Sequence, residues 1–183
     1  EVFCFVDADV LPNFELSTWL ELNQDPNGFY VYPEQKASEL AGFLIVAREH
    51  FFKVDGYDEA IRGWGGEDRD LYERLARTGL STHLVPQGSM SPILHGDELR
   101  QLEKDEGGFG SKRGTVSMHD LYRAIKRDSW QLTGQEIELE KRKELFKHIG
   151  MLREEALKRG ENTFEVMINI PMGREHNKFL KGL

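Results

Sequence analysis

Residues 56–75 read G-Y-D-E-A-I-R-G-W-G-G-E-D-R-D-L-Y-E-R-L, a glycine-rich loop that leads into a helical pattern. Glycine supplies the backbone freedom that a tight loop needs, and the loop contains Gly63, Gly65 and Gly66. Glu67 and Asp68 then open the predicted helix, whose N-terminus favours carboxylates by ~0.3 to 1 kcal/mol each. The two acids are therefore either simple partners of the helix dipole or part of a functional site.

The helical spacing predicts where Asp68 points. Leu71, Tyr72 and Leu75 lie three, four and seven residues after it, which is the spacing of one helix face. Asp68 heads this apolar stripe, so we expect its carboxylate to face the interior, where a cleft would lie.

The composition is that of a soluble globular protein of 183 residues, 39% of them hydrophobic. The formal net charge of -8 argues against nucleic acid as a partner, because phosphate binding needs a basic surface. An acidic protein that handles anions usually recruits a metal ion. The single cysteine, Cys4, cannot form an intrachain disulfide, and its apolar surroundings predict a buried small side chain.

Nothing in the sequence predicts a membrane span. No apolar stretch approaches the roughly 20 residues that cross a bilayer, and no signal peptide is recognisable. We therefore expect a cytoplasmic protein, either free or at the membrane periphery.

The first strand is expected at Val2–Val6, a continuous apolar run of the kind found at the centre of parallel sheets. Such a strand needs neighbours on both sides, yet the chain begins here, and without methionine. We therefore expect a fragment, in which a partner chain such as a second copy, or a rearranged sheet, covers this strand.

Two acids follow this strand in the sequence V-D-A-D-V-L-P. Asp7 and Asp9 stand at its C-terminal end, where open α/β sheets place their ligand crevices. Alternation along an extended chain puts both on the same side, so their like charges require a nearby cation. Mg²⁺ or Mn²⁺ suits carboxylates and completes its shell with phosphate oxygens. The alternative is that D-x-D simply ends the strand before a turn at Pro12.

The segments between these motifs are predicted to be scaffold. Asn13 can cap a helix that runs to about Leu22, and the helix from Glu67 should end at Gly79. Further strands are expected at Phe29–Tyr32, Ala41–Ala47 and Thr82–Val85.

Two residues of this scaffold are also candidates for the site. Gly42 marks either the close approach of a ligand or ordinary packing. His95 follows Ile93 and Leu94 at a strand end, where it either completes the shell of an ion held by Asp9 or has a structural role.

The character of the chain changes after residue 106. Glycine and serine are frequent at 107–117, which predicts a lid or a linker. Helices are expected at Met118–Arg127 and Gln135–Arg159, the second with an apolar face, and a late strand at Phe164–Ile170. We accordingly divide the chain into a catalytic region, residues 1–106, and a C-terminal helical extension, residues 107–183.

In this order, the motifs resemble those of the GT-A glycosyltransferases. D-A-D at a strand end is followed by an A-G strand, by G-Y-D-E and G-W-G-G-E-D, and by a strand-end histidine. The resemblance is strongest to the C-terminal catalytic half of the β-1,4-galactosyltransferase and chondroitin-polymerase families, and weaker to the polypeptide N-acetylgalactosaminyltransferases. It covers about Val2–Asp97 and depends most on G-W-G-G-E-D. It implies an α/β GT-A fold whose N-terminal nucleotide-binding half is absent from these residues.

The resemblance implies roles for individual residues. Asp9 and His95 correspond to the ligands of the ion, Mn²⁺ or Mg²⁺, beside the donor diphosphate. Trp64 and Glu67 correspond to residues that shape the sugar sites, and Asp68 corresponds to the catalytic base of inverting members. The other expected substrate-binding residues are Asp7, Gly42, Gly65 and Gly66.

The implied reaction is polysaccharide or glycoconjugate synthesis. A hexose or N-acetylhexosamine would pass from a UDP-sugar to a hydroxyl of an acceptor glycan, with a metal ion required and the anomeric configuration inverted.

Two departures from the family pattern bear on the site. Pro92 stands where galactosyltransferases place a methionine before the metal histidine, so the shell of the ion must differ or contain more water. Arg69 replaces an acid of E-D-D-D, and helical spacing puts it on the flank, away from Asp68.

Three other functions stay open at this point. A retaining N-acetylgalactosaminyltransferase-like enzyme would use the same motifs. A haloacid-dehalogenase-like phosphatase also starts with a strand and D-x-D, but His95-Gly96-Asp97 matches its later acidic motif poorly. A non-catalytic sugar-binding module is the third, although the presence of Asp9, Glu67, Asp68 and His95 together argues against it.

Overall fold

The computed structural model describes residues 1–33, 40, 42–62, 65–93, 112–160, 164–169 and 177–182. These residues form two compact units, the first within Glu1–Tyr57 and Asp68–Leu99 and the second within Asp58–Glu67 and Arg100–Leu183. The functional division at residue 106 stays a prediction.

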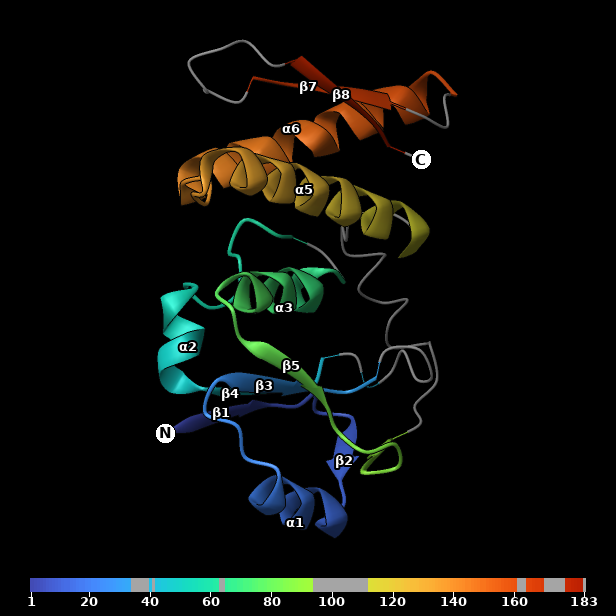
Figure 1. Cartoon of the computed structure of the whole chain (residues 1–183). Coiled ribbons are helices and arrows are strands. Elements are labelled where there is room, and N and C mark those ends of the chain that lie inside the picture. Colours follow the sequence, from blue (N-terminus) through green and yellow to red (C-terminus); the bar gives the residue numbers. More distant parts are fainter. Residues whose placement is uncertain are drawn as a thin grey trace. The chain divides into compact units, whose positions relative to one another are not determined.

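A four-stranded sheet forms the centre of the first unit (Figure 1). In spatial order its strands are β1 (Val2–Phe5), β4 (Leu44–Ala47), β3 (Gly28–Val31) and β5 (Ser81–Leu84). β4 runs antiparallel to both of its neighbours, whereas β5 runs parallel to β3. The sheet is therefore mixed, and the predicted α/β class is confirmed.

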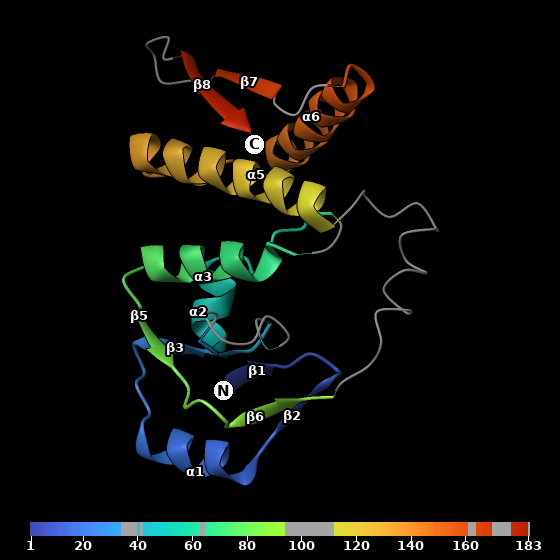
Figure 2. The same ribbon diagram turned by 90° about the vertical axis from the view of Figure 1, so that its right-hand side faces the viewer.

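Alternation along the strands gives this sheet two buried faces. On one face Tyr30 and Ile45 pack with Leu16 of α1 (Phe14–Leu22). The other face packs against the helices α2 (Arg48–Lys53) and α3 (Glu67–Arg77), through Phe29, Val31, Leu44 and Val46. Figure 2 shows α1 on one side of the sheet and α2 and α3 on the other. The first unit is thus a three-layer arrangement in which α3 begins at the predicted acids.

Helix α3 has the apolar stripe that its sequence predicts. Leu71 and Leu75 are fully buried against the sheet. Asp70 and Arg74 are also buried, as an ion pair with 2.8 Å between Oδ2 and Nε, and Arg74 donates a further hydrogen bond to the carbonyl of Val54. This pair therefore joins the later turns of α3 to the end of α2.

The helix ends also follow their sequence signals. The side chain of Asn13 accepts a hydrogen bond from the amide of Leu16 over 3.2 Å, which caps α1. Gly79, two residues beyond α3, has a φ of +91°, the left-handed conformation that ends many helices. Both predicted boundaries are therefore confirmed.

Strand β1 is not buried within the described residues, and the prediction that it has neighbours on both sides stays untested. β1 lies at the end of the sheet, antiparallel to β4, and no described strand pairs with its other edge. Val2 is 65% exposed, and Cys4 is exposed rather than buried. An apolar run does not distinguish an edge strand from a central one, because residues distant in sequence set the strand order. The strand expected at Ala41–Ala47 likewise begins only at Leu44.

A second, two-stranded sheet lies next to the D-x-D motif. It pairs β2 (Val10–Pro12) with β6 (Met90–Pro92) in antiparallel register. This pairing brings together two segments that are about 80 residues apart in sequence and that hold the predicted metal ligands near their ends.

The second unit contains two long helices, α5 (Lys112–Thr133) and α6 (Leu139–Lys158), and an antiparallel strand pair, β7 (Phe164–Asn169) and β8 (Asn177–Gly182). The core between the helices also includes Ala60 and Ile61 from the loop before α3. Ile149 and Ala156 are buried along α6, as its apolar spacing predicts. Among the described helices, none has both the length and the apolar character needed to cross a membrane.

Candidate active site

Asp7 and Asp9 lie in a tight turn between β1 and β2. The amide of Val10 donates to the carbonyl of Asp7 over 3.1 Å, which closes the turn. The assumption of an extended chain through D-x-D is therefore wrong, and strand alternation does not decide how the two carboxylates are oriented. Asp7 is exposed and Asp9 is half-buried.

Gly42 leaves room for the carboxylate of Asp7 just before β4. A Cβ added at Gly42 would lie 2.8 Å from Oδ2 and 2.9 Å from Oδ1 of Asp7, closer than real Cβ atoms approach such neighbours. The space beside this glycine is thus occupied by Asp7, and any larger residue would displace the first acid of the D-x-D motif.

Strand β6 leads toward His95 along the D-x-D turn. The amide of Ile93, directly after β6, donates to the carbonyl of Asp9 over 2.6 Å. His95 lies outside the described residues, but it follows Ile93 by two residues, and two residues span at most about 7 Å. The covalent chain therefore allows His95 and Asp9 to bind the same metal ion. Among the described residues, no three histidine, cysteine or acidic side chains gather as a metal site.

The loop before α3 has the positive φ angles that its glycines permit. Gly65 and Gly66 have φ values of +86° and +93°, a region that residues with a Cβ rarely adopt. Glu67 and Asp68 follow in the first turn of α3, as expected from the sequence. Trp64 lies outside the described residues.

Asp68 is half-buried and is held by a tyrosine of the first unit. The hydroxyl of Tyr57 donates to Oδ1 of Asp68 over 3.3 Å. The ring of Tyr57 packs edge-on against Phe5 and Phe51, with centroids 5.6 and 6.1 Å away. Arg69 is exposed, as its predicted place on the helix flank requires. The aromatic cluster therefore orients the carboxylate that the family resemblance implies is a base.

Glu67 carries an atom that the described protein does not satisfy. Its Oε2 is buried without a hydrogen-bond partner among the described residues. A buried polar atom in that state costs ~1 to 3 kcal/mol, which a bound hydroxyl group would recover. Glu67 thus has the chemistry of a side chain that binds a polar ligand.

Asp58 anchors the loop before α3 to α5 and α6, a role that the sequence did not reveal. Its Oδ2 lies 2.5 Å from Nζ of Lys126 and 2.8 Å from the hydroxyl of Tyr122, and its Oδ1 lies 3.1 Å from Nη1 of Arg142. The available signal is Lys126 itself, which falls on the apolar face of its helix four residues after Tyr122.

Burial alone raises the pKa of Asp58, but its partners reverse the shift. The ammonium of Lys126, the amide of Ala60 and the guanidinium of Arg142 outweigh burial and lower the pKa to about 2. Asp58 is therefore a buried anion at neutral pH, and it ties the glycine loop to α5 and α6 within the second unit.

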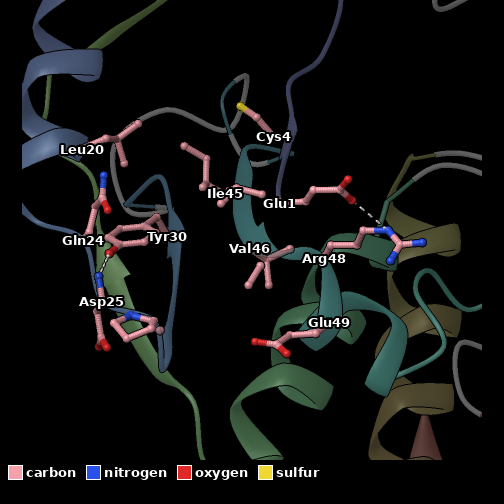
Figure 3. Close-up of a pocket in the computed structure, with 14 residues that line it drawn as sticks. Glu1, Cys4, Leu20, Gln24, Asp25, Tyr30, Ile45, Val46, Arg48 and Glu49 are labelled. Atoms are coloured by element: carbon pink, nitrogen blue, oxygen red, sulfur yellow. Dashed lines mark hydrogen bonds and ion pairs between the residues drawn. The ribbon is translucent and has the colours of Figure 1, made fainter.

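A pocket of about 1160 Å³ in the first unit contains none of the predicted site residues. Figure 3 shows Leu20 and Ile45 among its lining side chains. Its charged lining residues are Glu1, Asp25, Arg48 and Glu49. The one cation of this set, Arg48, is paired with Glu1 over 3.2 Å, so the pocket is acidic and does not suit a diphosphate.

Part of the candidate site, from Gly42 to His95, falls within a segment that matches a known family, whereas Asp7 and Asp9 precede that segment. A family model described as the N-terminal domain of galactosyltransferase matches residues 29–96. Human β-1,4-galactosyltransferase 4 is 26% identical over 136 residues, which cover 70% of this chain and 37% of the human protein.

Two other relatives show the same relationship. A probable N-acetylgalactosaminyltransferase 9 from Caenorhabditis elegans is 30% identical over 116 residues, 59% of this chain and 20% of that protein. Bovine β-1,4-galactosyltransferase 1 is 31% identical over 85 residues, 43% of this chain and 21% of the bovine protein. No solved structure matches the chain.

These matches show that the chain is similar to galactosyltransferases and to an N-acetylgalactosaminyltransferase, so the resemblance inferred from the motifs to these two groups is confirmed. The chain spans between 20% and 37% of the length of these three relatives.

Proposed function

We propose that the chain is the catalytic part of a glycosyltransferase that moves a hexose or N-acetylhexosamine from a UDP-sugar to a hydroxyl of an acceptor glycan. The observation that carries this proposal is the galactosyltransferase match to residues 29–96, which includes Glu67 and Asp68 at the start of α3. A β-1,4-galactosyltransferase and a probable N-acetylgalactosaminyltransferase among the relatives support both classes of sugar.

Asp68 is the base of the proposed reaction. The N-terminus of α3 favours its ionised form, and Tyr57 fixes the orientation of its carboxylate. The carboxylate takes the proton of the acceptor hydroxyl while the oxygen bonds to the anomeric carbon and the bond from that carbon to the diphosphate breaks. A single displacement of this kind inverts the anomeric configuration, and general-base assistance is worth ~10² to 10⁴ in rate.

Glu67 binds the acceptor in this proposal. Its buried Oε2, which has no hydrogen-bond partner among the described residues, accepts a hydrogen bond from a sugar hydroxyl. Gly65 and Gly66 give the loop its turn, and Trp64 stacks on a sugar face.

Asp9 and His95 would hold a divalent cation, Mn²⁺ or Mg²⁺, with Asp7 acting through a water molecule. Carboxylate and imidazole ligands suit such an ion, and the hydrogen bond between Ile93 and Asp9 brings the chain before His95 to the D-x-D turn. When bound, the cation neutralises the charge of the departing diphosphate.

The test is transfer by the full chain. Incubation with a panel of nucleotide sugars, acceptor glycans and Mn²⁺ should release nucleoside diphosphate, and chelation by EDTA should stop the release. Asp9→Asn should weaken Mn²⁺ activation at least tenfold. Asp25→Asn is the matched control and should leave Mn²⁺ activation unchanged. Asp25 lines the acidic pocket of about 1160 Å³ and pairs with His83 over 2.7 Å.

The stereochemistry of the product is a separate readout. NMR of the new linkage should show the inverted configuration, and a retained configuration would assign the chain to the retaining N-acetylgalactosaminyltransferase-like class. Absence of diphosphate release with every donor and acceptor would overturn the proposed function.

A further inference from the structure

We infer that His119 is a positioning residue, which sets the conformation of the loop carrying Trp64 and Glu67 by binding two backbone carbonyls of that loop. The consequence for catalysis rests on the proposed function, whereas the effect on the loop itself does not.

Both ring nitrogens of His119 face the loop. Nδ1 contacts the carbonyl oxygen of Gly65, and Nε2 lies 2.9 Å from the carbonyl oxygen of Arg62. Carbonyl oxygens only accept hydrogen bonds, so a neutral ring donates to one of them and a protonated ring to both. In the sequence these two carbonyls stand before and after residues 63 and 64, so the ring binds the loop at two separate points.

The backbone of the loop lies directly on the side chain of His119. A Cβ added at Gly66 would come within 2.8 Å of Cβ and 3.1 Å of Nδ1 of His119. Gly66 also has a φ of +93°, so this position requires glycine for two independent reasons. A residue larger than glycine just before Glu67 would thus collide with the side chain of His119.

Packing within α5 and α6 does not account for an imidazole at this position. His119 is fully buried, and its ring lies 5.4 Å from that of Phe146. An apolar ring would fill the same space beside Phe146. What only a histidine adds is a pair of nitrogen atoms, and both face carbonyls of the loop.

The functional consequence is a preorganised acceptor site. The carbonyls of Arg62 and Gly65 are fixed, and Glu67 follows Gly65 by two residues, so fewer loop conformations compete with the one that presents its carboxylate. His119 is expected to touch no substrate, and its loss should raise the KM for the acceptor more than the KM for the donor.

The test compares His119→Phe, which keeps the ring shape without donors, with His119→Gln, which keeps donor groups. Ile125→Ala is the matched control, because Ile125 is fully buried on the same helix and in the same cluster. All variants carry Trp19→Phe and Trp130→Phe, which leave Trp64 as the single tryptophan of the full chain.

The fluorescence of Trp64 reports directly on how accessible this part of the loop is to a quencher. His119→Phe should raise acrylamide quenching of Trp64 about twofold, His119→Gln should lie closer to the parent, and Ile125→Ala should match the parent. In transfer assays, His119→Phe should raise the acceptor KM about tenfold with little change in donor KM. Should His119→Phe not fold, the comparison of His119→Gln with Ile125→Ala decides, and the glutamine variant should show the larger change in quenching.

The outcomes separate this inference from the proposed function. Equal quenching in the parent and in the His119 variants, or an equal change in Ile125→Ala, would overturn the positioning role. A change in quenching confined to the His119 variants, with no transfer even by the parent, would sustain the positioning role and reject the proposed function.

Discussion

The hydroxyl of Tyr57 donates a hydrogen bond to Oδ1 of Asp68, 3.3 Å away. Tyr57 is fixed in turn by Phe5 of β1 and Phe51 of α2. The orientation of Asp68 therefore depends on an aromatic cluster that joins the edge strand of the sheet to the helices on one face.

Tyr57→Phe should lower the turnover of transfer about fivefold, because the lost hydrogen bond is worth about 1 kcal/mol. The KM for the donor should change little, since the hydroxyl that is removed donates to the base. Tyr72→Phe is the matched control, because its hydroxyl donates instead to the carbonyl of Phe43 over 3.0 Å. Steady-state kinetics that show the same loss of turnover in both variants would assign Tyr57 a purely structural role.

Gly42→Ala should impair metal activation, because the new Cβ would lie 2.8 Å from the carboxylate of Asp7 and displace it. We expect the Mn²⁺ concentration for half-maximal activity to rise about tenfold. Gly150→Ala is the control within a helix, where the new Cβ meets only Sδ of Met118 at 3.6 Å. That variant should gain up to about 1 kcal/mol of stability and keep its metal response. An unchanged Mn²⁺ titration in Gly42→Ala would show that Asp7 does not contribute to metal binding.

Acid should lower the free energy of unfolding of the second unit, because Asp58 becomes protonated. Its pKa is lowered from an ordinary value of 3.8 to about 2, so its ion pairs stabilise the folded state fully above about pH 4. As the pH falls toward 2, this group should contribute about 2 kcal/mol less to the free energy of unfolding. Urea unfolding at pH 5 and at pH 2.5 measures the difference.

Asp58→Asn should remove this pH dependence and cost about 3 to 5 kcal/mol at pH 7, because Lys126 stays buried without its counter-charge. Asp120→Asn is the matched control on α5, where an exposed carboxylate pairs with Arg123 over 3.0 Å, and it should cost under about 1 kcal/mol. Equal losses in the two variants would show that the buried cluster does not anchor the loop.

The sequence predicted the local structure around the candidate site well. The cap at Asn13, the glycine loop, the helix from Glu67 and its stop at Gly79 all depend on backbone preferences of a few neighbouring residues. The stripe formed by Leu71 and Leu75 is likewise a local pattern, and both side chains are buried.

Long-range arrangement was less predictable. Val2–Val6 reads as a central strand of a parallel sheet, whereas β1 is the last strand of the described sheet and runs antiparallel to β4, because strand order and direction are not set by the strand's own apolar run. Asp58 and His119 were missed for a similar reason, since their partners lie more than 50 residues away in the sequence. Single charged or imidazole side chains on an apolar helix face were the available signals.

The central claim is that Asp68 acts as a base, and the comparison of Asp68→Asn with Arg69→Ala tests it most directly. Asp68→Asn keeps the shape of the side chain and removes its basicity, whereas Arg69 is the next residue on the exposed flank of α3. Diphosphate release by the full chain, measured with donor affinity in parallel, should fall by ~10² or more in Asp68→Asn at unchanged donor affinity, and stay near the parent value in Arg69→Ala. Equal effects of the two substitutions on transfer, or loss of donor binding in Asp68→Asn, would contradict the assignment and leave Asp68 as a structural residue at the start of the helix.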